Sequence, residues 1–362
     1  LGQRYDVVVT NPPYISSSRM EGTLKQYVEK TYPSTKSDLF ATFILRCLEL
    51  CNEDGLTGYM TPFVWMFISS YEKLREEIID KHFINNLIQL EYSGFDGATV
   101  PICTFTLRNN FIPEAEGSYI RLSDFKGAKV QGPKTLEAIQ NQNCGWFYTA
   151  NQKDFEKIPS YKLGYWLQPN TLEIFENNSL WEESADFKFG MSTANNAKYI
   201  RTWQEIVLND FKKFNGNKWF PANNGGEYRR WYGNREDVLF WENNGEEIIN
   251  GKGTVRNKQY YFKEGISWTS ISSSTISVRC FEEDFVFTSA GFCAFSENDL
   301  DRLKLLGFLN SKVALNLLKV YSPTLNFNVG DIQKLPNSNK NFSYKVVTAS
   351  INLAKADWNS RE

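Results

Sequence analysis

Four consecutive residues near the start of the sequence, Asn11, Pro12, Pro13 and Tyr14, have the side chains and spacing for one particular reaction. They directly follow a β-branched run at residues 7–9, which predicts a buried strand covered on both faces. Ligand sites in open parallel sheets lie at the carboxyl ends of strands, so the loop is in the expected place for a catalytic site. The alternative is an ordinary rigid turn that leaves a strand.

The chemistry that this loop favours is methyl transfer to an amine on a heteroaromatic ring. Such an amine is a poor nucleophile because its lone pair is delocalised into the ring. The side-chain oxygen of Asn11 and the carbonyl of Pro12 can each accept a hydrogen bond from it. These acceptors offset the positive charge that develops during transfer. Pro13 adds rigidity to the loop, and Tyr14 offers a flat face on which an extruded base can stack. No acid, base or metal ion is required.

The elements that must position the loop alternate between strand and helix over the first 125 residues, which predicts an α/β domain with a largely parallel sheet. Apolar spacing predicts one helix over residues 38–50, with Asp38 near its N-terminus, and another from Ser69 to His82. The last two or three strands are expected to close the sheet in antiparallel fashion. The predicted strands cover residues 5–10, 56–60, 87–92, 102–107 and 119–122.

The sequence changes character after about residue 186, where turn signals multiply. Short strands are expected at residues 238–241 and 286–287, and helices at residues 300–321 and 344–358. This pattern predicts a second, α+β domain. We therefore expect a catalytic region over residues 1–160, a connecting segment over 161–185, a recognition domain over 186–336 and a helical segment over 337–362.

Two groups of cations lie among aromatic residues in this second half. Arginine can read guanine edges in a bidentate manner and lysine can neutralise phosphates, so both groups are candidate DNA-binding surfaces. The arginines of the first group are expected to be exposed, so that their loss leaves the fold intact. The alternative is that both groups are solvated charges beside core aromatics. The candidates are Arg229, Arg230 and Arg235 in the first group, and Lys252, Arg256 and Lys258 in the second.

The bulk composition is that of a globular protein: 362 residues, of which 41% are hydrophobic, with a formal net charge of -2. Any DNA-binding surface must therefore be local. The six cysteines show no CxxC spacing and there is a single histidine, so no metal site is expected. No apolar run is long enough to cross a membrane and no signal peptide is visible. We expect a cytoplasmic protein with reduced thiols.

Residues 7–14 (VVVTNPPY) resemble motif IV of the amino-methyltransferases that use S-adenosylmethionine. Residues 37–43, 58–62 and 95–100 are similar, in order, to motifs V, VI and VIII of the adenine-N6 DNA methyltransferases. The resemblance implies a Rossmann-like catalytic domain with a mixed, mostly parallel sheet. By the same resemblance, Asn11 and Pro12 bind the target amine, Tyr14 and Phe95 sandwich the flipped base, and Phe43 and Asn11 lie against the cofactor.

The second half of the chain also has a family resemblance. Residues 225–234 and 260–266 look like the region that follows the catalytic domain in methyltransferases of BREX phage-defence systems and in fused, type IIG-like restriction–modification enzymes. Residues 322–327, with Asp331 and Leu335 beyond them, resemble the end of such recognition domains. This implies double-stranded DNA as partner, with other phage-defence proteins as further candidates.

One departure from the family pattern concerns the cofactor. The Gly-rich motif I that binds S-adenosylmethionine belongs upstream of motif IV, and residues 1–6 leave no room for it. The chain also starts without Met. We therefore expect a piece of a longer protein that binds the cofactor weakly and is inactive alone.

Three functions remain open at this point. The first is a site-specific DNA adenine methyltransferase, active as part of a longer chain. The second is a DNA-recognition module without catalysis of its own. The third is a protein glutamine N5-methyltransferase, which shares the tetrapeptide. A large recognition domain after the catalytic region counts against the third.

Overall fold

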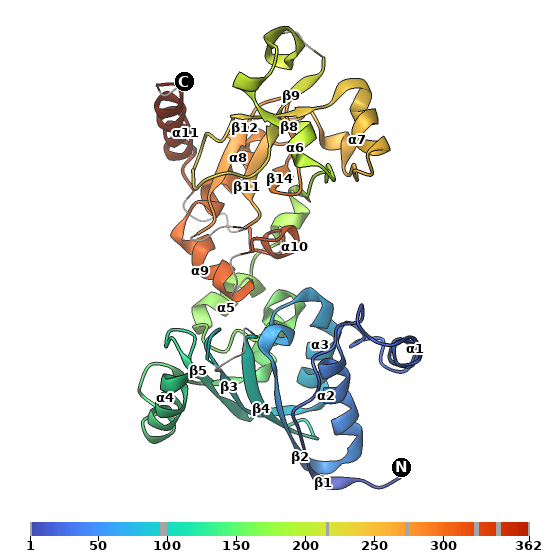
Figure 1. Ribbon diagram of the computed structural model, residues 1–362. Coiled ribbons are helices and arrows are strands. Elements are labelled where there is room, and N and C mark those ends of the chain that lie inside the picture. Colours follow the sequence, from blue (N-terminus) through green and yellow to red (C-terminus); the bar gives the residue numbers. More distant parts are fainter. Residues whose placement is uncertain are drawn as a thin grey trace. The chain divides into compact units, whose positions relative to one another are not determined.

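The computed structural model describes residues 2–94, 100–214, 217–271, 275–321, 326–337 and 342–360. The chain divides into two compact units, Leu1–Asn177 and Asn178–Glu362 (Figure 1). Within the described residues, the first unit contains one six-stranded sheet and the second contains two four-stranded sheets. The boundary falls within the segment expected to connect the two domains.

The sheet of the first unit has the strand order β1-β2-β4-β3-β5-β6. β1 is parallel to β2, and β3 is parallel to β5, whereas β4 is antiparallel to both β2 and β3. β1, β2, β3 and β5 therefore run in one direction, so their carboxyl ends share one edge of the sheet. This confirms the mixed, mostly parallel sheet. The strands are β1 (Tyr5–Thr10), β2 (Cys51–Pro62), β3 (Phe83–Gln89), β4 (Ile102–Arg108), β5 (Glu116–Arg121) and β6 (Phe147–Asn151).

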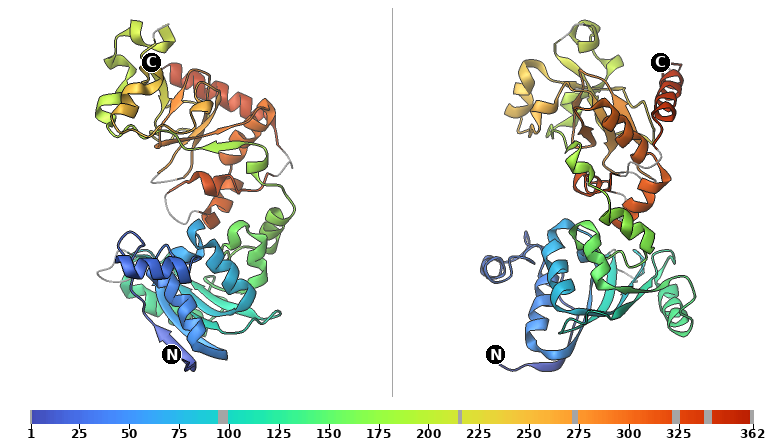
Figure 2. Two further views of the ribbon diagram at one scale, coloured as in Figure 1. Left: turned by 90° about the vertical axis from the view of Figure 1, so that its right-hand side faces the viewer. Right: turned by 180° about the vertical axis from the view of Figure 1, so that it is seen from behind.

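Two helices supply most of the apolar cover on one face of this sheet (Figure 2). Phe40 and Ile44 of α2 and Leu74 of α3 belong to the same buried cluster as Phe105 of β4. Their apolar residues recur at helical spacing, which places them on the side that faces the strands. α4 packs elsewhere, where Ala138 meets the side chains of β5. The helices of this unit are α1 (Gly22–Thr31), α2 (Leu39–Leu50), α3 (Glu72–Lys81), α4 (Ala128–Gln140) and α5 (Pro169–Glu176).

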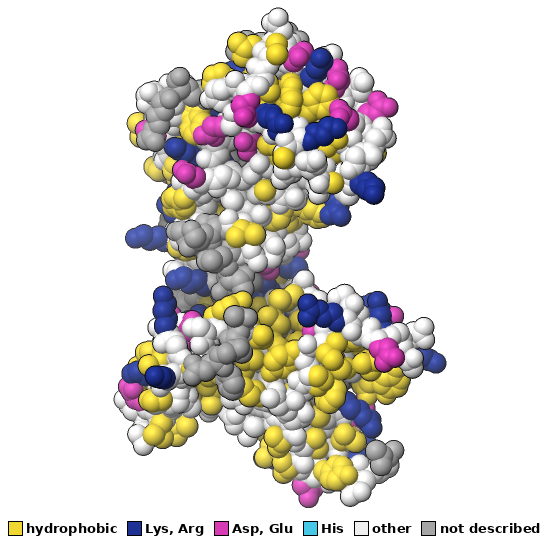
Figure 3. Space-filling model, in the orientation of Figure 1, with side chains coloured by type: hydrophobic (Ala, Val, Ile, Leu, Met, Phe, Trp, Pro, Cys, Tyr) yellow, Lys and Arg dark blue, Asp and Glu magenta, His cyan; other side chains and the backbone are white. Residues whose placement is uncertain are grey.

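The expectation that the first strand is covered on both faces is wrong. Side chains alternate between the faces of a strand, and only Val8 packs against the core. Val7 and Val9 point the other way and are 60% and 75% exposed. Figure 3 shows hydrophobic side chains gathered on the surface over β1 and β2. β1 is thus an edge strand with one uncovered face within the described residues.

Several local predictions for the first unit hold. α2 begins at Leu39 and is capped by Asp38 as expected, and β4 matches the expected strand closely. Three differ. The strand expected at residues 56–60 is β2, which begins earlier at Cys51, and the strand expected at residues 87–92 is β3, which begins earlier at Phe83. The strand expected at residues 119–122 is β5, which is parallel to β3. β4 is antiparallel to its neighbours as expected, and the second antiparallel strand is β6.

The second unit is α+β, as expected. Its two sheets have the orders β13-β9-β10-β8 and β12-β11-β14-β7. Leu239 of β10, Phe287 of β13 and Cys293 of β14 lie in one buried cluster, so the two sheets share a core. The strands are β7 (Asp186–Lys188), β8 (Ile200–Thr202), β9 (Trp219–Asn223), β10 (Asp237–Phe240), β11 (Gly265–Thr269), β12 (Val278–Phe281), β13 (Val286–Phe287) and β14 (Gly291–Phe295).

The helical pattern expected at residues 300–321 forms two helices, α8 and α9. The side-chain amide of Asn310 bonds to the carbonyl of Val278 at 2.8 Å, and Val278 donates back to it. That exchange ties the end of α8 to β12. The helices of this unit are α6 (Asn196–Tyr199), α7 (Glu246–Asn250), α8 (Asp299–Leu309), α9 (Lys312–Tyr321), α10 (Val329–Ile332) and α11 (Tyr344–Asn359).

Two further properties concern the whole described chain. None of its helices is long and apolar enough to cross a membrane. All six cysteines are free thiols, in line with the sequence-based expectation.

Candidate active site

The tetrapeptide of residues 11–14 leaves the carboxyl end of β1. Thr10 pairs with Tyr59 of β2, so the loop lies beside the last residues of that strand. Asn11 is exposed and Pro12 is buried. The side chain of Asn11 is therefore accessible to a ligand, while a buried proline anchors the backbone beside it.

Tyr14 is held in place from two sides. Its hydroxyl lies 3.2 Å from the carbonyl of Met60 and 3.4 Å from Oδ1 of Asn11, and it can donate its one proton to either. The edge of its ring meets Phe40 of α2, with centroids 6.2 Å apart and planes at 83°. Burial raises the pKa of Tyr14, so the hydroxyl stays protonated and remains a donor. With 38% of the residue exposed, the tyrosine is both positioned and accessible.

Asp38 connects the loop to the helix that follows it. Its Oδ1 accepts hydrogen bonds from the amide of Ile15 at 3.0 Å and from the amide of Phe40 at 3.3 Å. The carbonyl of Ile15 accepts a third bond, from the amide of Leu39 at 3.0 Å. Burial raises the pKa of Asp38, while the bonds from the backbone amides oppose that rise. One carboxylate thus caps α2 and fixes the residue after Tyr14.

Replacing Asp38 with alanine is expected to lower stability and activity together. The helix loses its cap, which costs about 1 kcal/mol, and the Ile15 amide loses a partner, which costs about 1 kcal/mol more. We expect urea unfolding to show a loss of about 2 kcal/mol. In a full-length parent protein, we expect the freed loop to lower the rate of the methyl transfer that the sequence predicts.

Asn298→Ala is the matched control for Asp38→Ala. The side chain of Asn298 caps α8 in the second unit by accepting from the amide of Leu300 at 2.9 Å. This variant is expected to lose similar stability but to keep full activity. Equal activity of the two variants would show that Asp38 acts only as a helix cap.

The family resemblance also assigns roles to Phe43 and Phe95, and the structure describes only the first of these residues. Phe43 lies one turn after Phe40 on α2 and is half-buried, packed against the buried cluster of Met20, Val28 and Leu39. Phe95 lies outside the described residues. Its assignment to the flipped base remains a prediction.

Sequence reasoning missed the supports of the loop. Phe40 was noted only as part of a motif, and Met60 contributes through its backbone carbonyl, which no side-chain pattern reveals. For Asp38, the cap itself was predictable, but its bond to Ile15 depends on the fold.

The first cationic cluster of the second unit is packed rather than free. Arg229 and Arg230 are half-buried, so the expectation of full exposure is wrong. The Arg229 guanidinium lies 4.8 Å from the ring centroid of Trp358 in α11. A Cβ added at Gly233 would lie 2.8 Å from Arg229 and 2.9 Å from Trp358, so this contact is tight. Long charged side chains cover apolar surface in this way.

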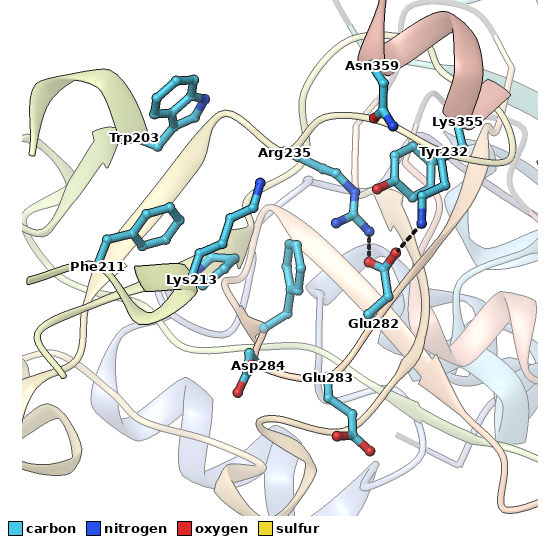
Figure 4. A pocket seen from close by; sticks show the side chains of 12 residues that line it. Trp203, Phe211, Lys213, Tyr232, Arg235, Glu282, Glu283, Asp284, Lys355 and Asn359 are labelled. Carbon is cyan, nitrogen blue, oxygen red and sulfur yellow. Dashed lines mark hydrogen bonds and ion pairs between the residues drawn. The ribbon is translucent and has the colours of Figure 1, made fainter. Parts of the chain in front are cut away.

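Arg235 is enclosed by two aromatic rings and a carboxylate. Its guanidinium lies 4.0 Å from the ring centroid of Tyr232 and 4.9 Å from that of Phe285. It forms an ion pair with Glu282, which also lies 3.5 Å from Nζ of Lys355 in α11. Figure 4 shows these groups at one end of a cavity of about 510 Å³. Glu282 therefore links Lys355 of α11 and Arg235 of the 232–235 loop to the β12–β13 turn.

Arg229→Ala is expected to destabilise the second unit by ~1–2 kcal/mol, because the stack on Trp358 is lost. Thermal or chemical unfolding measures this effect. Lys258→Ala is the control, since Lys258 is exposed. Equal stability of the two variants would show that the Arg229 stack contributes nothing.

The second cationic cluster is more accessible. Lys252, Arg256 and Lys258 are all exposed. The Arg256 guanidinium lies 5.0 Å from the ring centroid of Phe189, and Lys258 lies 5.9 Å from that of Trp241. No ion pair of these three cations is found within the described part of the chain. Their charge is therefore available to an anionic partner.

Comparison with known proteins first shows which class of proteins the chain is similar to. Residues 2–95 match the family model described as Eco57I restriction-modification methylase. The fold is similar to that of the Type IIL restriction-modification enzyme MmeI solved in complex with DNA, with a TM-score of 0.60 and 11% identity over 98% of this chain and 49% of that one. The fold is also similar to that of a nuclease-deletion mutant of the Type ISP restriction-modification enzyme LlaGI. The TM-score is 0.54 and the sequence identity is 11%, over 96% of this chain and 41% of that one. The predicted fold class is confirmed.

Two curated relatives are more specific. The chain is 36% identical to the adenine-specific methyltransferase PglX of Lacticaseibacillus casei (strain Zhang). It is 35% identical to the adenine-specific methyltransferase BrxX of Escherichia coli O9:H4 (strain HS). Both matches cover 100% of this chain but only 32% and 30% of the relatives. The resemblance to adenine-specific methyltransferases is confirmed, and the chain spans about a third of the length of these relatives.

Proposed function

We propose that this chain is part of a site-specific DNA methyltransferase that methylates N6 of an adenine extruded from the duplex, in phage defence or restriction–modification. The observation that carries the proposal is the loop at the carboxyl end of β1. An exposed Asn11 side chain stands there beside an anchored proline and a Tyr14 held by Met60 and Phe40.

The reaction needs few protein groups. Oδ1 of Asn11 and the carbonyl of Pro12 accept the two amine hydrogens of adenine, and they stabilise the charge that develops on nitrogen. The partly exposed ring of Tyr14 stacks on the extruded base. Pro13 limits the motion of the loop. Because the hydroxyl of Tyr14 competes for Asn11 in the free protein, the base takes over that acceptor when it enters, while Tyr14 keeps its bond to Met60.

When bound, S-adenosylmethionine would supply the methyl group from its sulfonium, which leaves as a thioether. The residues present fit one side of such a cofactor. The partly exposed aromatic ring of Phe43 would hold the adenine ring of the cofactor, and the exposed, polar side chain of Asn11 would contact it as well.

We assign target recognition to the second unit. The exposed Lys252, Arg256 and Lys258, with Phe189 beneath Arg256, support this assignment better than the packed Arg229 and Arg235 do. Double-stranded DNA is the proposed partner. A recognition module without catalysis is the second candidate, and these exposed cations are the observation that favours it.

Methyl transfer by a full-length parent protein distinguishes the candidates. The protein is incubated with duplex DNA and S-adenosylmethionine labelled in the methyl group, and the DNA is digested to nucleosides. We expect label in N6-methyl-2′-deoxyadenosine from DNA. Label in protein glutamine would indicate a protein glutamine N5-methyltransferase. DNA binding without methyl transfer would indicate a recognition module.

A further inference from the structure

The carboxyl edge of the first sheet carries a second feature, at the far end from Asn11. β1, β2, β3 and β5 end at this edge, and Arg121 is the last residue of β5. The edge therefore extends from Asn11 to Arg121. With four strand intervals of about 4.8 Å, these two residues are about 19 Å apart along the edge.

A crossing segment, residues 162–167, lies over the strand ends between them. The amide of Leu163 donates to the carbonyl of Met66 at 3.3 Å, just beyond β2. The hydroxyl of Tyr165 donates to Oε1 of Gln89, the last residue of β3, at 2.7 Å. The crossing segment is thus bonded to the ends of two strands, which fixes the residue that follows, Trp166.

Trp166 in turn orients Arg121. The guanidinium carbon of Arg121 lies 4.3 Å from the Trp166 ring centroid, and the rings of Tyr165 and Phe67 lie 4.9 Å and 6.0 Å from that centroid. Both Arg121 and Trp166 are half-exposed. No carboxylate in the described ranges forms an ion pair with Arg121. Stacking on an aromatic ring pre-organises a guanidinium without neutralising it.

We infer that Arg121, stacked on Trp166, binds a DNA backbone phosphate outside the target base pair, as a contact made by the catalytic unit itself. The inference rests on the proposed function. A separation of about 19 Å corresponds to five or six base pairs at about 3.4 Å each, so the contact falls on duplex beside the extruded base. Trp166 is the positioning residue.

The test measures duplex binding by a full-length parent protein as a function of salt, with a fluorescent duplex oligonucleotide. Arg121→Gln is expected to reduce the slope of log K against log salt by about 0.9. When salt rises from 50 to 200 mM, both proteins lose affinity. The fold-loss of the wild type should be about 3.5 times that of the variant. Arg121→Lys keeps the charge and should keep the slope. Trp166→Ala should weaken binding with an unchanged slope.

Lys134→Gln is the matched control. Lys134 also stacks on an aromatic ring of the first unit, 4.6 Å from the Trp146 centroid, but Glu137 already pairs with it at 2.7 Å. Its loss should leave the slope unchanged. A folded Arg121→Gln protein with the wild-type slope would overturn the inference and leave Arg121 a structural residue.

A second variant applies if Arg121→Gln does not fold. Gln168 is exposed and follows Trp166 by two residues. Gln168→Glu should weaken duplex binding, and unchanged binding would overturn the inference. Failure of the proposed function is distinguishable, because the wild-type protein would then transfer no methyl group to DNA.

Discussion

Asn11→Ala in a full-length parent protein is expected to lower the rate of DNA methylation by about 10²–10³-fold. The change removes one of two acceptors for the amine hydrogens, and their effect is greatest when charge develops on nitrogen. The loss is comparable to that of one pre-organised donor in an oxyanion hole. Single-turnover methylation measures it.

Binding should separate this role from a structural one. The Asn11 side chain is exposed, so its removal should change DNA affinity and stability little. Asn52→Ala is the matched control: Asn52 bonds to Asp6 at the other end of β1, at 2.7 Å, away from the proposed site. That variant should methylate at the wild-type rate. An Asn11→Ala protein within a few-fold of wild type would disprove the assigned role.

Replacing Lys252, Arg256 and Lys258 together with glutamine is expected to have the second largest effect. If each neutralises one phosphate, the slope of log K against log salt falls by about 2.7. The affinity of the wild type then decreases about 40-fold more than that of the variant between 50 and 200 mM salt. Since the three side chains are exposed, the fold should be unaffected.

A triple control uses cations of the same unit that already have partners. Lys198 pairs with Glu247 at 2.6 Å, Lys212 with Asp284 at 3.9 Å and Lys218 with Asp210 at 3.5 Å. Replacing these three with glutamine changes the net charge equally and should leave the slope nearly unchanged. Equal slopes for the two triple variants would show that only total charge matters, and that the second cluster is not a binding surface.

The parts of the fold that were predictable are those encoded by contiguous patterns. The apolar spacing of residues 39–50 and the capping Asp38 define α2 without reference to the rest of the chain. The β-branched run before Asn11 likewise defines β1. Short strands such as β8 and β12 were missed, because their few residues carry no periodic signal and depend on partners far along the chain.

Side-chain exposure was the least predictable property. Arginine is usually a surface residue, yet Arg229 and Arg235 pack on the rings of Trp358 and Tyr232. The fold creates these contacts, and the residue type does not reveal them. Val7 and Val9 show the reverse error, since their apolar character suggested burial. The support of Tyr14 by the Met60 carbonyl, 46 residues away, is of the same long-range kind.

The uncovered edge of β1 affects how this polypeptide behaves in the test tube. β1 pairs on one side with β2, and within the described ranges no strand pairs with its other side. A row of unpaired amide and carbonyl groups beside Val7 and Val9 is a template on which another chain can add a strand. We expect self-association through this edge, and eventual aggregation, to become more frequent as protein concentration rises. Purification and storage of the isolated polypeptide therefore favour dilute solution.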